Sequence, residues 1–301
     1  MRILITGSSG FVGTSLHNYF NKNDQIEVTA LDLRKPVALE MISDAAAIIH
    51  LAGKAHDLKK TSKDEEYFTV NTTLTKTLFD LFLKSNINDF IYFSSVKAVA
   101  DAVSGVLTEE PVPNPKTPYG RSKQQAEAYL LSQELPKGKR LIIIRPCMIH
   151  GPGNKGNLNL LHKVVKIGLP YPLAAFKNLR SFLAIDNLNY VIERLITDQS
   201  IPGGIYNVAD DDPLSTNEVI RIMSQLEGHK AKLWKISPQL IKMIAAVGDK
   251  LWLPLNAERL RKLTESYIVS NEKLKMALNI KQLPIKATVG LEKTIQSFSS
   301  H

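Results

Sequence analysis

Short, continuous apolar runs alternate with helical patterns along the first half of the chain. The runs lack a polar residue at every second position, which is typical of strands covered on both faces of a sheet. They lie at Ile3–Thr6, Val28–Leu31, Ala47–Leu51, Phe90–Phe93 and Leu141–Ile144. Helical patterns fill the intervals at Gly13–Phe20, Glu66–Lys84 and Tyr119–Gln133. This alternation predicts an α/β fold with a doubly wound parallel sheet, whose ligand site lies at the carboxyl ends of the strands.

The pattern loosens after Pro146, where Gly151-Pro152-Gly153 interrupts the chain. One more strand is predicted at Ile205–Val208, and the predicted helices are Asn187–Thr197, Thr216–Glu227 and Pro238–Leu253. We therefore expect residues 1–150 to form the main sheet domain and residues 151–301 a smaller C-terminal lobe. Strands and helices of the second half remain able to return to the sheet.

Composition narrows the class of protein. The chain has 301 residues, of which 44% are hydrophobic and 22% charged, and these proportions exclude a disordered or low-complexity protein. The net charge of +9 is spread along the chain, which favours diffuse surface charge, then a phosphate-bearing ligand, over nucleic acid. No apolar run approaches the roughly 20 residues of an integral membrane segment. A single cysteine, Cys147, cannot form an intramolecular disulfide, which favours a reducing, cytoplasmic setting.

A glycine-rich turn follows the first predicted strand. Gly7, Gly10 and Gly13 are spaced G-x-x-G-x-x-G and open the first helix at Phe11 and Val12. Glycines permit a tight turn and let main-chain N–H groups approach a pyrophosphate at the helix N-terminus. Any strand-to-helix turn favours glycine, but this position after the first strand favours a dinucleotide site. The pattern predicts a Rossmann-type domain.

An acidic residue, Asp32, ends the second predicted strand. A carboxylate there accepts hydrogen bonds from the two adenosine ribose hydroxyls and repels a 2′-phosphate, which favours NAD over NADP. Arg34 is close enough in sequence to soften this preference by pairing with a phosphate. The alternative is an aspartate that only begins a loop.

Two further segments carry groups suited to proton transfer. Tyr119 and Lys123 are four residues apart and share one face of a predicted helix. An ammonium group beside a phenol lowers the pKa of the phenol, which can then exchange a proton with a sugar hydroxyl or a ketone. Ser94 and Ser95 end the fourth predicted strand, where a hydroxyl can donate to a developing oxyanion. The alternatives are a chance Y-x-x-x-K spacing and serines that cap a turn.

Together these motifs resemble the extended short-chain dehydrogenase/reductase family, in particular the branch that acts on nucleotide sugars. That branch includes UDP-galactose 4-epimerase and bacterial 4-keto-sugar reductases. The resemblance extends over nearly the whole chain. It adds Leu51, Ala52 and Gly53 beside the cofactor, Asn71 on the next helix, Pro146 near the nicotinamide, Asn157 and Leu158 on the substrate side, and Arg180 at the diphosphate of the sugar nucleotide.

The resemblance implies an NAD-dependent enzyme that exchanges a hydride at C4 of a UDP-linked sugar, as an epimerase or a 4-ketoreductase. Tyr119 would exchange the proton, with Ser95 and Lys123 as its catalytic partners, and Arg180 would hold the diphosphate. Residues 1–150 would bind NAD, and residues 151–301 would bind the sugar nucleotide. It also implies a homodimer that pairs the helices Glu66–Lys84 and Tyr119–Gln133 across a two-fold axis.

Three positions depart from the family pattern. Counting back from Val99, the usual catalytic hydroxyl falls on Val96, so Ser95 stands one residue early. The segment S-S-V-K-A-V resembles that of certain 4-keto-6-deoxy-hexosamine reductases and related epimerases more than that of the galactose enzyme, which implies that Lys97 contacts the substrate. The stretch from Asp32 to Ala47 is short and lacks the G-D-(I/L) that brackets adenine. No Asp-Glu pair follows Ser95, which disfavours dehydration.

Other signals favour structural roles. His50, His56, His150 and His162 lack metal-ligand spacing, and no metal site is predicted. The amphipathic segment Ile236–Leu253 is interpreted as a helix of the small lobe with snorkelling lysines, the alternative being a helix that lies on a membrane surface. The alternative to an enzyme is an NAD-binding sensor or scaffold that has lost catalysis.

Overall fold

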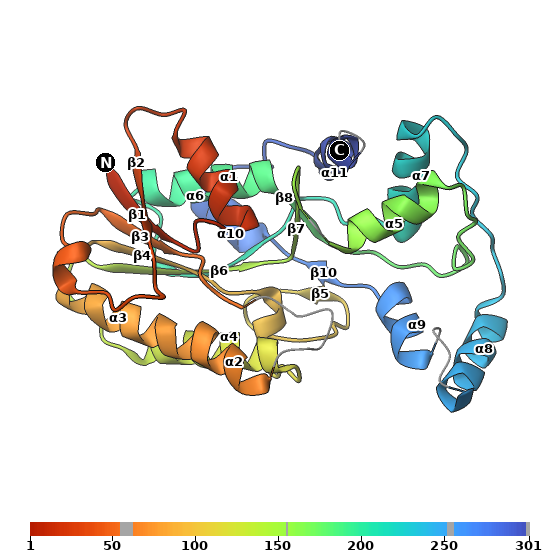
Figure 1. The fold of residues 1–301 in the computed structure, drawn as a ribbon, viewed down its shortest axis with the longest axis horizontal. Helices are drawn as coiled ribbons and strands as arrows, with labels where there is room; N and C mark the ends of the chain where they lie inside the picture. The colour runs from red at the N-terminus through yellow and green to blue at the C-terminus, as the bar shows by residue number, and fades with distance from the viewer. Residues whose placement is uncertain (55–62, 155, 252–255, 299–301) are drawn as a thin grey trace.

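A six-stranded, wholly parallel sheet forms the centre of the computed structural model, which describes residues 1–54, 63–154, 156–251 and 256–298 (Figure 1). Its strand order is β2-β1-β3-β4-β6-β9. The strands are β1 (Arg2–Thr6), β2 (Glu27–Leu31), β3 (Ala47–His50), β4 (Asp89–Phe93), β6 (Arg140–Pro146) and β9 (Gly204–Val208). The α/β, Rossmann-type fold predicted from the sequence is confirmed, and each predicted strand is present with shifts of one or two residues at its ends.

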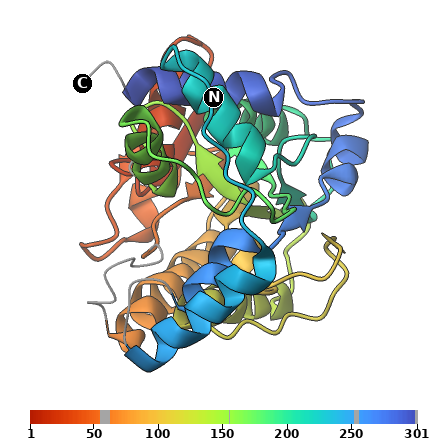
Figure 2. The ribbon, with the colours of Figure 1, turned by 90° about the vertical axis from the view of Figure 1, so that its right-hand side faces the viewer.

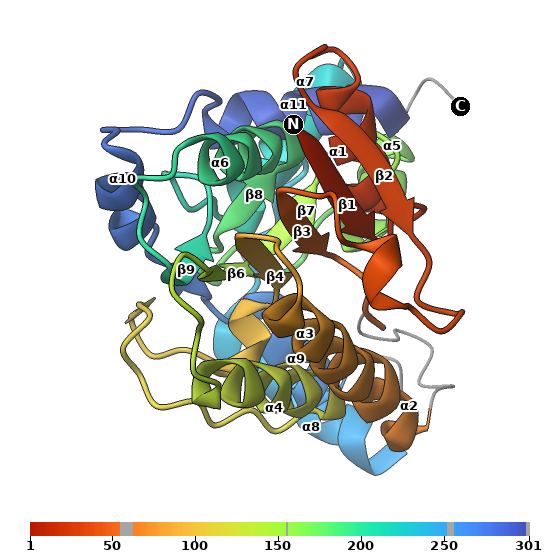
Figure 3. The same ribbon diagram turned by 90° about the vertical axis from the view of Figure 1, so that its left-hand side faces the viewer.

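Helices cover both faces of the sheet (Figure 3). One face carries α1 (Phe11–Phe20) and α6 (Ile185–Thr197). The other carries α2 (Asp64–Phe68), a π-helical turn η2 (Thr69–Thr73), α3 (Leu74–Lys84) and α4 (Pro118–Ser132). The inner strands are mostly apolar because successive side chains enter different cores. Ile3 and Ile5 pack into one cluster and Leu4 into the other.

The edge of the sheet at β2 reflects the short Asp32–Ala47 segment. Instead of a further strand, this segment contains one short 3-10 helix, η1 (Leu39–Met41). The chain passes from β1 to β2 on one side of β1, and then to β3 on its other side. The strand order therefore reverses between β1 and β3. Ligands of doubly wound sheets bind in the crevice at such a point.

The smaller lobe is built from later elements on the right of Figure 1. Its first cluster joins α5 (Asn157–Lys166), α7 (Thr216–Leu226) and α11 (Ala287–Phe298), with Phe182 of β8 (Phe182–Ala184) among the buried side chains. A second, smaller cluster lies between α8 (Pro238–Leu251) and α9 (Ala257–Thr264). The remaining elements are η3 (Val96–Ala98), β5 (Val106–Leu107), β7 (Met148–His150), β10 (Ile268–Val269) and α10 (Glu272–Leu278).

The two halves of the chain share a core, because β8, α6 and β9 run from the small lobe back to the sheet. Leu188 and Ile192 of α6 belong to the same cluster as Ile3 of β1. None of the described helices is long and apolar enough to cross a membrane.

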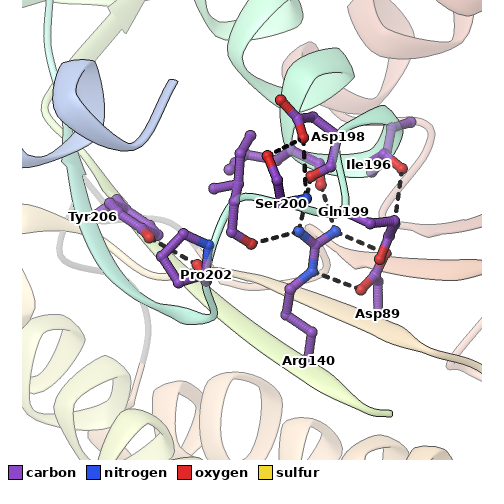
Figure 4. A network of polar contacts seen from close by, with 10 residues as sticks. Asp89, Arg140, Ile196, Asp198, Gln199, Ser200, Pro202 and Tyr206 are labelled. Atoms are coloured by element: carbon purple, nitrogen blue, oxygen red, sulfur yellow. Dashed lines mark hydrogen bonds and ion pairs between the residues drawn. The ribbon is translucent and has the colours of Figure 1, made fainter. Parts of the chain in front are cut away.

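A buried ion pair fixes the amino end of the sheet (Figure 4). The Arg140 guanidinium donates to both carboxylate oxygens of Asp89, at 2.8 and 2.9 Å. Its other N–H groups donate to the main-chain carbonyls of Leu195, Asp198 and Ile201 at the end of α6. One side chain therefore ties β4 and β6 to the segment that leads into β9.

We expect Arg140→Met to lower the free energy of unfolding by about 3 to 5 kcal/mol, because Asp89 would stay buried without its counter-charge. Urea unfolding followed by circular dichroism measures this change. The control Arg221→Met, at an exposed position, should change the unfolding free energy by less than about 0.5 kcal/mol. An Arg140→Met protein as stable as this control would contradict the prediction.

Candidate active site

The glycine turn brings three chain segments into close approach. Gly7 has φ +68°, and a Cβ there would lie 2.8 Å from the main-chain nitrogen of Ala52. A Cβ at Gly13 would lie 2.4 Å from the Gly7 oxygen. Gly10 precedes α1 as its N-cap and provides no side-chain cap, so the first-turn N–H groups at Phe11 and Val12 face the crevice without one. A side chain at position 7 or 13 would collide with these main-chain atoms, so both positions require glycine.

Asp32 and Arg34 meet at the end of β2. The Arg34 guanidinium donates to both Asp32 carboxylate oxygens at 2.9 Å, and the Arg34 main-chain N–H donates to one of them at 3.0 Å. The Arg34 hydrogen bonds lower the pKa of Asp32 to about 2, so this exposed carboxylate is charged at neutral pH. The structure therefore holds Arg34 against Asp32, with both carboxylate oxygens accepting hydrogen bonds from Arg34.

Asn71 fixes the loop that follows β3. Its side-chain amide accepts from the Lys54 N–H at 2.7 Å and donates to the Lys54 carbonyl at 3.1 Å and to the Ser122 hydroxyl at 2.9 Å. It lies in the π-helical turn, a feature that often marks functional sites. A Cβ at Gly53 would lie 3.0 Å from Asn71 Oδ1 and 3.1 Å from Lys123 Nζ. Gly53, Asn71 and Lys123 are thus brought together.

The Tyr119 phenol lies near the Ser95 side chain, which lowers the pKa of the phenol. Ser95 Oγ accepts from the Lys97 N–H at 3.2 Å and caps η3. The neighbouring Val96 is buried in the main hydrophobic cluster. The turn after β4 therefore places Ser95 near the phenol and Val96 in the core. Ser95, and not Val96, is thus the residue beside Tyr119, despite the one-residue offset from the family pattern.

The expected effect of Lys123 on the phenol does not occur in the free chain. Lys123 Nζ donates to the Phe93 carbonyl at 2.7 Å and lies 4.9 Å above the Tyr92 ring. Burial lowers the pKa of Lys123 to about 8. The pKa of Tyr119 is raised by burial, against a smaller lowering effect of the Ser95 side chain. The expectation was wrong for this state because the amine is directed to the end of β4.

Two contacts that sequence reasoning missed hold α4 in place. Asp101 accepts from the Thr117 hydroxyl at 3.0 Å, and Thr117 Oγ1 in turn accepts from the Gly120 N–H at the start of the helix. Glu127 and Arg145 form an ion pair with a shortest distance of 2.6 Å, both side chains being 3% exposed. Thr117-Pro118 before Tyr119 is a helix-start signal from which the cap between Thr117 and Gly120 could have been predicted. No local signal linked Glu127 with Arg145.

Lys97 in the loop after β4 lies near Arg180 of the small lobe. Lys97 Nζ lies 4.0 Å above the Tyr267 ring and donates to the Asp101 carbonyl at 2.8 Å. Burial lowers the pKa of Lys97, and Arg180 lowers it further. The Arg180 guanidinium donates to the carbonyls of Glu265, at 3.2 Å, and of Lys262 at the end of α9. The structure thus brings Lys97 and Arg180 within electrostatic reach of each other.

The other predicted residues lie around this region in different environments. Pro146 ends β6 and pairs with Val208 of β9. Asn157 is exposed at the start of α5, whereas the Leu158 side chain packs in the small-lobe core. Cys147 is buried, and burial raises the pKa of its thiol.

The contacts of His50 indicate a structural role for this residue. His50 is held between the hydroxyls of Thr6 and Thr75, at 2.7 and 2.8 Å, and burial lowers its pKa to about 3. No group of metal ligands occurs among the described residues. His56 lies outside them.

The residues present fit a dinucleotide. Gly7 and Gly13 leave room for main chain where a Cβ would collide, and Asp32 is exposed at the ribose end. At the other end, the buried Ser94 hydroxyl has no hydrogen-bond partner within the described part of the chain. These features line the carboxyl edge from β2 to β4.

The sequence model of the NAD dependent epimerase/dehydratase family matches residues 3–209 of the chain. The chain belongs to this family. It is therefore an NAD-dependent enzyme of the short-chain dehydrogenase/reductase type, as the motifs indicated. The match extends from β1 through β9, so it includes the small-lobe elements that return to the sheet.

Curated relatives act on nucleotide-linked or lipid-linked sugars according to their names. The chain is 30% identical over 241 residues to the UDP-glucose 4-epimerase of Vibrio cholerae, covering 73% of this chain and 74% of that protein. It is 29% identical over 243 residues to the N-acetyl-alpha-D-glucosaminyl-diphospho-ditrans,octacis-undecaprenol 4-epimerase of Escherichia coli O157:H7, covering 74% and 71%. This chain is thus similar to two epimerases over most of its length.

Solved structures share the fold over the whole chain. The UDP-N-acetylglucosamine 4-epimerase from Bacillus cereus matches with a TM-score of 0.76 at 22% identity, covering 99% of both chains. MoeE5 in complex with UDP-glucose and NAD matches with a TM-score of 0.76 at 17% identity, covering 100% of this chain and 99% of that one. At these identities the likeness establishes the fold of this epimerase-family protein.

We expect Lys123→Met to raise the unfolding free energy of the cofactor-free protein at pH 7 by about 1 to 2 kcal/mol. Depression of the Lys123 pKa from 10.5 to about 8 makes its buried charge unfavourable by about 3 kcal/mol, and losing the bond to the Phe93 carbonyl offsets about 1 kcal/mol. The unfolded chain binds this proton more tightly, so wild-type stability rises from pH 8 to 10.5.

Urea unfolding at neutral and alkaline pH checks this prediction. The advantage of the Lys123→Met protein should be present below pH 8 and disappear as the pH approaches 10.5. The same protein should lose most of its NAD affinity. A difference in stability that does not change with pH would contradict a charged, buried Lys123.

The pairing of Asp32 with Arg34 predicts a change in cofactor preference. Asp32→Ser removes the carboxylate that repels a 2′-phosphate and frees Arg34 to bind one. The ratio of NADPH to NADH affinity, measured by fluorescence titration, should rise by about tenfold or more. The double variant Asp32→Ser/Arg34→Gln should lose that gain. Equal ratios in both variants would exclude Arg34 as the phosphate partner.

Proposed function

We propose that this protein exchanges a hydride at C4 of a UDP-linked sugar, either as a 4-epimerase or as a 4-ketoreductase. The observation that carries the proposal is the position of the Tyr119 phenol beside Ser95, which caps η3 directly after β4. A phenol paired with a hydroxyl can exchange a proton with a carbinol or a ketone. The names of the relatives, UDP-glucose 4-epimerase among them, supply the sugar class.

In the proposed mechanism each site residue has a separate task. NAD, when bound along the carboxyl edge, supplies the hydride acceptor and donor. Tyr119 takes the proton of the C4 hydroxyl during oxidation and returns it during reduction. Ser95 donates to the same sugar oxygen and holds it at hydrogen-bond distance from the phenol. Lys123, whose amine lies beside Gly53 and Asn71, holds the nicotinamide ribose.

Arg180 of the small lobe and Lys97 of the loop after β4 would hold the diphosphate. Arg180 and Lys97 are both partly or largely buried and within electrostatic reach of each other. Two confined cations favour a compact anion with several charges over a neutral ligand. Arg180 would exchange a carbonyl at the end of α9 for phosphate oxygens, and Asn157 would lie on the sugar-nucleotide side at the start of α5.

The direction of net reaction depends on whether the keto sugar leaves. An epimerase retains it and returns the hydride to the other face, whereas a reductase takes up a keto sugar and reduced cofactor. The segment from Ser94 to Val99 resembles reductases and related epimerases alike, whereas the names of two relatives favour the epimerase. We further propose a cytoplasmic homodimer, paired through α2–α3 and α4 as the family resemblance implies.

A substrate panel tests the proposal. The purified protein is incubated with UDP-hexoses, UDP-N-acetylhexosamines and their 4-keto-6-deoxy derivatives, with and without NADH. We expect redox-neutral interconversion for an epimerase and stoichiometric NADH consumption for a reductase. A protein that binds NAD but turns over none of these sugars would support the NAD-binding sensor instead.

Within the same assay, Tyr119→Phe should lower kcat by about 100-fold or more while leaving NAD affinity within about twofold. The control Tyr129→Phe removes a phenol on the same helix that bonds Asp80, and its kcat should stay at the wild-type level. Turnover that survives in Tyr119→Phe would show that another group moves the proton.

A further inference from the structure

The small lobe leaves one side of α8 without cover. Leu240, Met243, Ile244 and Val247 are between 45% and 66% exposed. They recur at the i, i+3, i+4, i+7 spacing that places side chains on a single face of a helix. We call these four residues the α8 stripe. A second set on the same helix, Ile241 and Ala245, is buried against Leu173 and Leu260.

α8 therefore has more apolar surface than the lobe can bury. Its inward face completes the small cluster with α9, and its outward face remains open to solvent. This contrasts with α7, whose buried residues Val219, Ile220 and Met223 lie on one side and whose exposed positions are mostly polar. Contiguous exposed apolar surface of this kind marks an interaction site more often than a chance distribution of side chains.

The charge around the stripe identifies the kind of partner. Residues 229–248 contain four lysines, at positions 230, 232, 235 and 242, and no aspartate or glutamate. All four lysines are exposed. In Figure 2 the segment that joins α7 to α8 and α8 itself lie on the same side of the molecule. The exposed apolar stripe thus adjoins a lysine-rich segment without acidic residues, which is complementary to a surface that is apolar inside and anionic outside.

Trp234 adds a further feature of such an interface. Its side chain is 56% exposed on the extended segment before α8, while the main chain there is fixed by hydrogen bonds between Trp234 and Tyr171 and between Ala174 and Trp234. Tryptophan concentrates at the headgroup level of bilayers because its ring is apolar and its N–H is polar. Lysine side chains beside it can reach the phosphate layer.

We propose that this enzyme docks through α8 onto an anionic phospholipid surface, with the α8 stripe inserted at the acyl boundary and Lys232, Lys235 and Lys242 at the headgroups. The helix lies in the plane of the interface, as amphipathic helices with a basic polar side do. The inference does not depend on the substrate, since the stripe belongs to no residue set placed around Tyr119.

Vesicle co-sedimentation of the full chain tests the proposal. Vesicles of phosphatidylethanolamine and phosphatidylglycerol are compared with phosphatidylcholine vesicles in about 0.1 M salt, where the Debye length is about 10 Å. We expect binding to the anionic vesicles only. Met243→Gln/Val247→Gln should weaken it by at least about tenfold. The matched control Met276→Gln/Val289→Gln changes the same residue types at exposed positions of α10 and α11 and should bind as the wild type does.

A second pair of variants separates local from overall charge. Lys232→Gln/Lys235→Gln/Lys242→Gln should abolish most of the anionic-vesicle binding. Lys22→Gln/Lys84→Gln/Lys137→Gln removes the same charge from exposed positions elsewhere and should leave the binding within about twofold, since screened charges act within a Debye length. Equal loss in both sets would overturn the docking surface.

Two further outcomes would also overturn the proposal. One is a wild-type chain that stays in the supernatant with anionic vesicles. The other is conversion of a dimer to a monomer by Met243→Gln/Val247→Gln, seen by light scattering, with unchanged vesicle binding, because a second copy would then cover the stripe. Turnover of UDP-sugars in water is recorded in parallel, so that failure of the proposed activity and failure of membrane docking are distinguished.

Discussion

The position of α4 against the ends of β4 and β6 is the constraint on which the site depends. Helix α4 carries Tyr119 and Lys123. The Phe93 carbonyl lies at the end of β4, and Ser95 follows two residues later. A shift of α4 by one residue would separate the phenol from Ser95 and the ammonium from that carbonyl together. The buried Glu127–Arg145 pair makes such a shift unfavourable, since a displaced helix would leave two charges without partners at positions that are 3% exposed.

The same region shows why polar groups accumulate under the site. Lys123, Asn71 and His50 are all buried, and each is held by main-chain or hydroxyl partners. Groups fixed in advance at a carboxyl edge need no reorganisation when a charged ligand arrives. The depressed pKa of Lys123 indicates that the cofactor-free protein tolerates an unfavourable charge there. Its ligand would relieve this penalty, which connects stability of the fold to occupancy of the site.

Much of the sheet could be predicted because its inner strands are buried on both faces and therefore mostly apolar. Strands β1, β3, β4 and β6 carry that signal most clearly. The two-residue strands β5 and β10 do not, since a pair of apolar residues in a loop has no period to detect. The glycine turn and Y-x-x-x-K were found because their chemistry is local in sequence. The Glu127–Arg145 and Lys97–Tyr267 contacts were missed because they join residues 18 and 170 positions apart.

Helix α8 illustrates a limit of a different kind. Its amphipathic pattern was visible in the sequence, and the preferred interpretation placed its apolar face inside the lobe. The structure buries Ile241 and Ala245 but leaves the α8 stripe in solvent, because the cluster beneath is too small to cover the whole apolar arc. A hydrophobic period shows that one face of a helix is apolar, but it does not show what covers that face. The acid-free stretch around Lys235 supplies that missing information, and it points outward to an anionic surface.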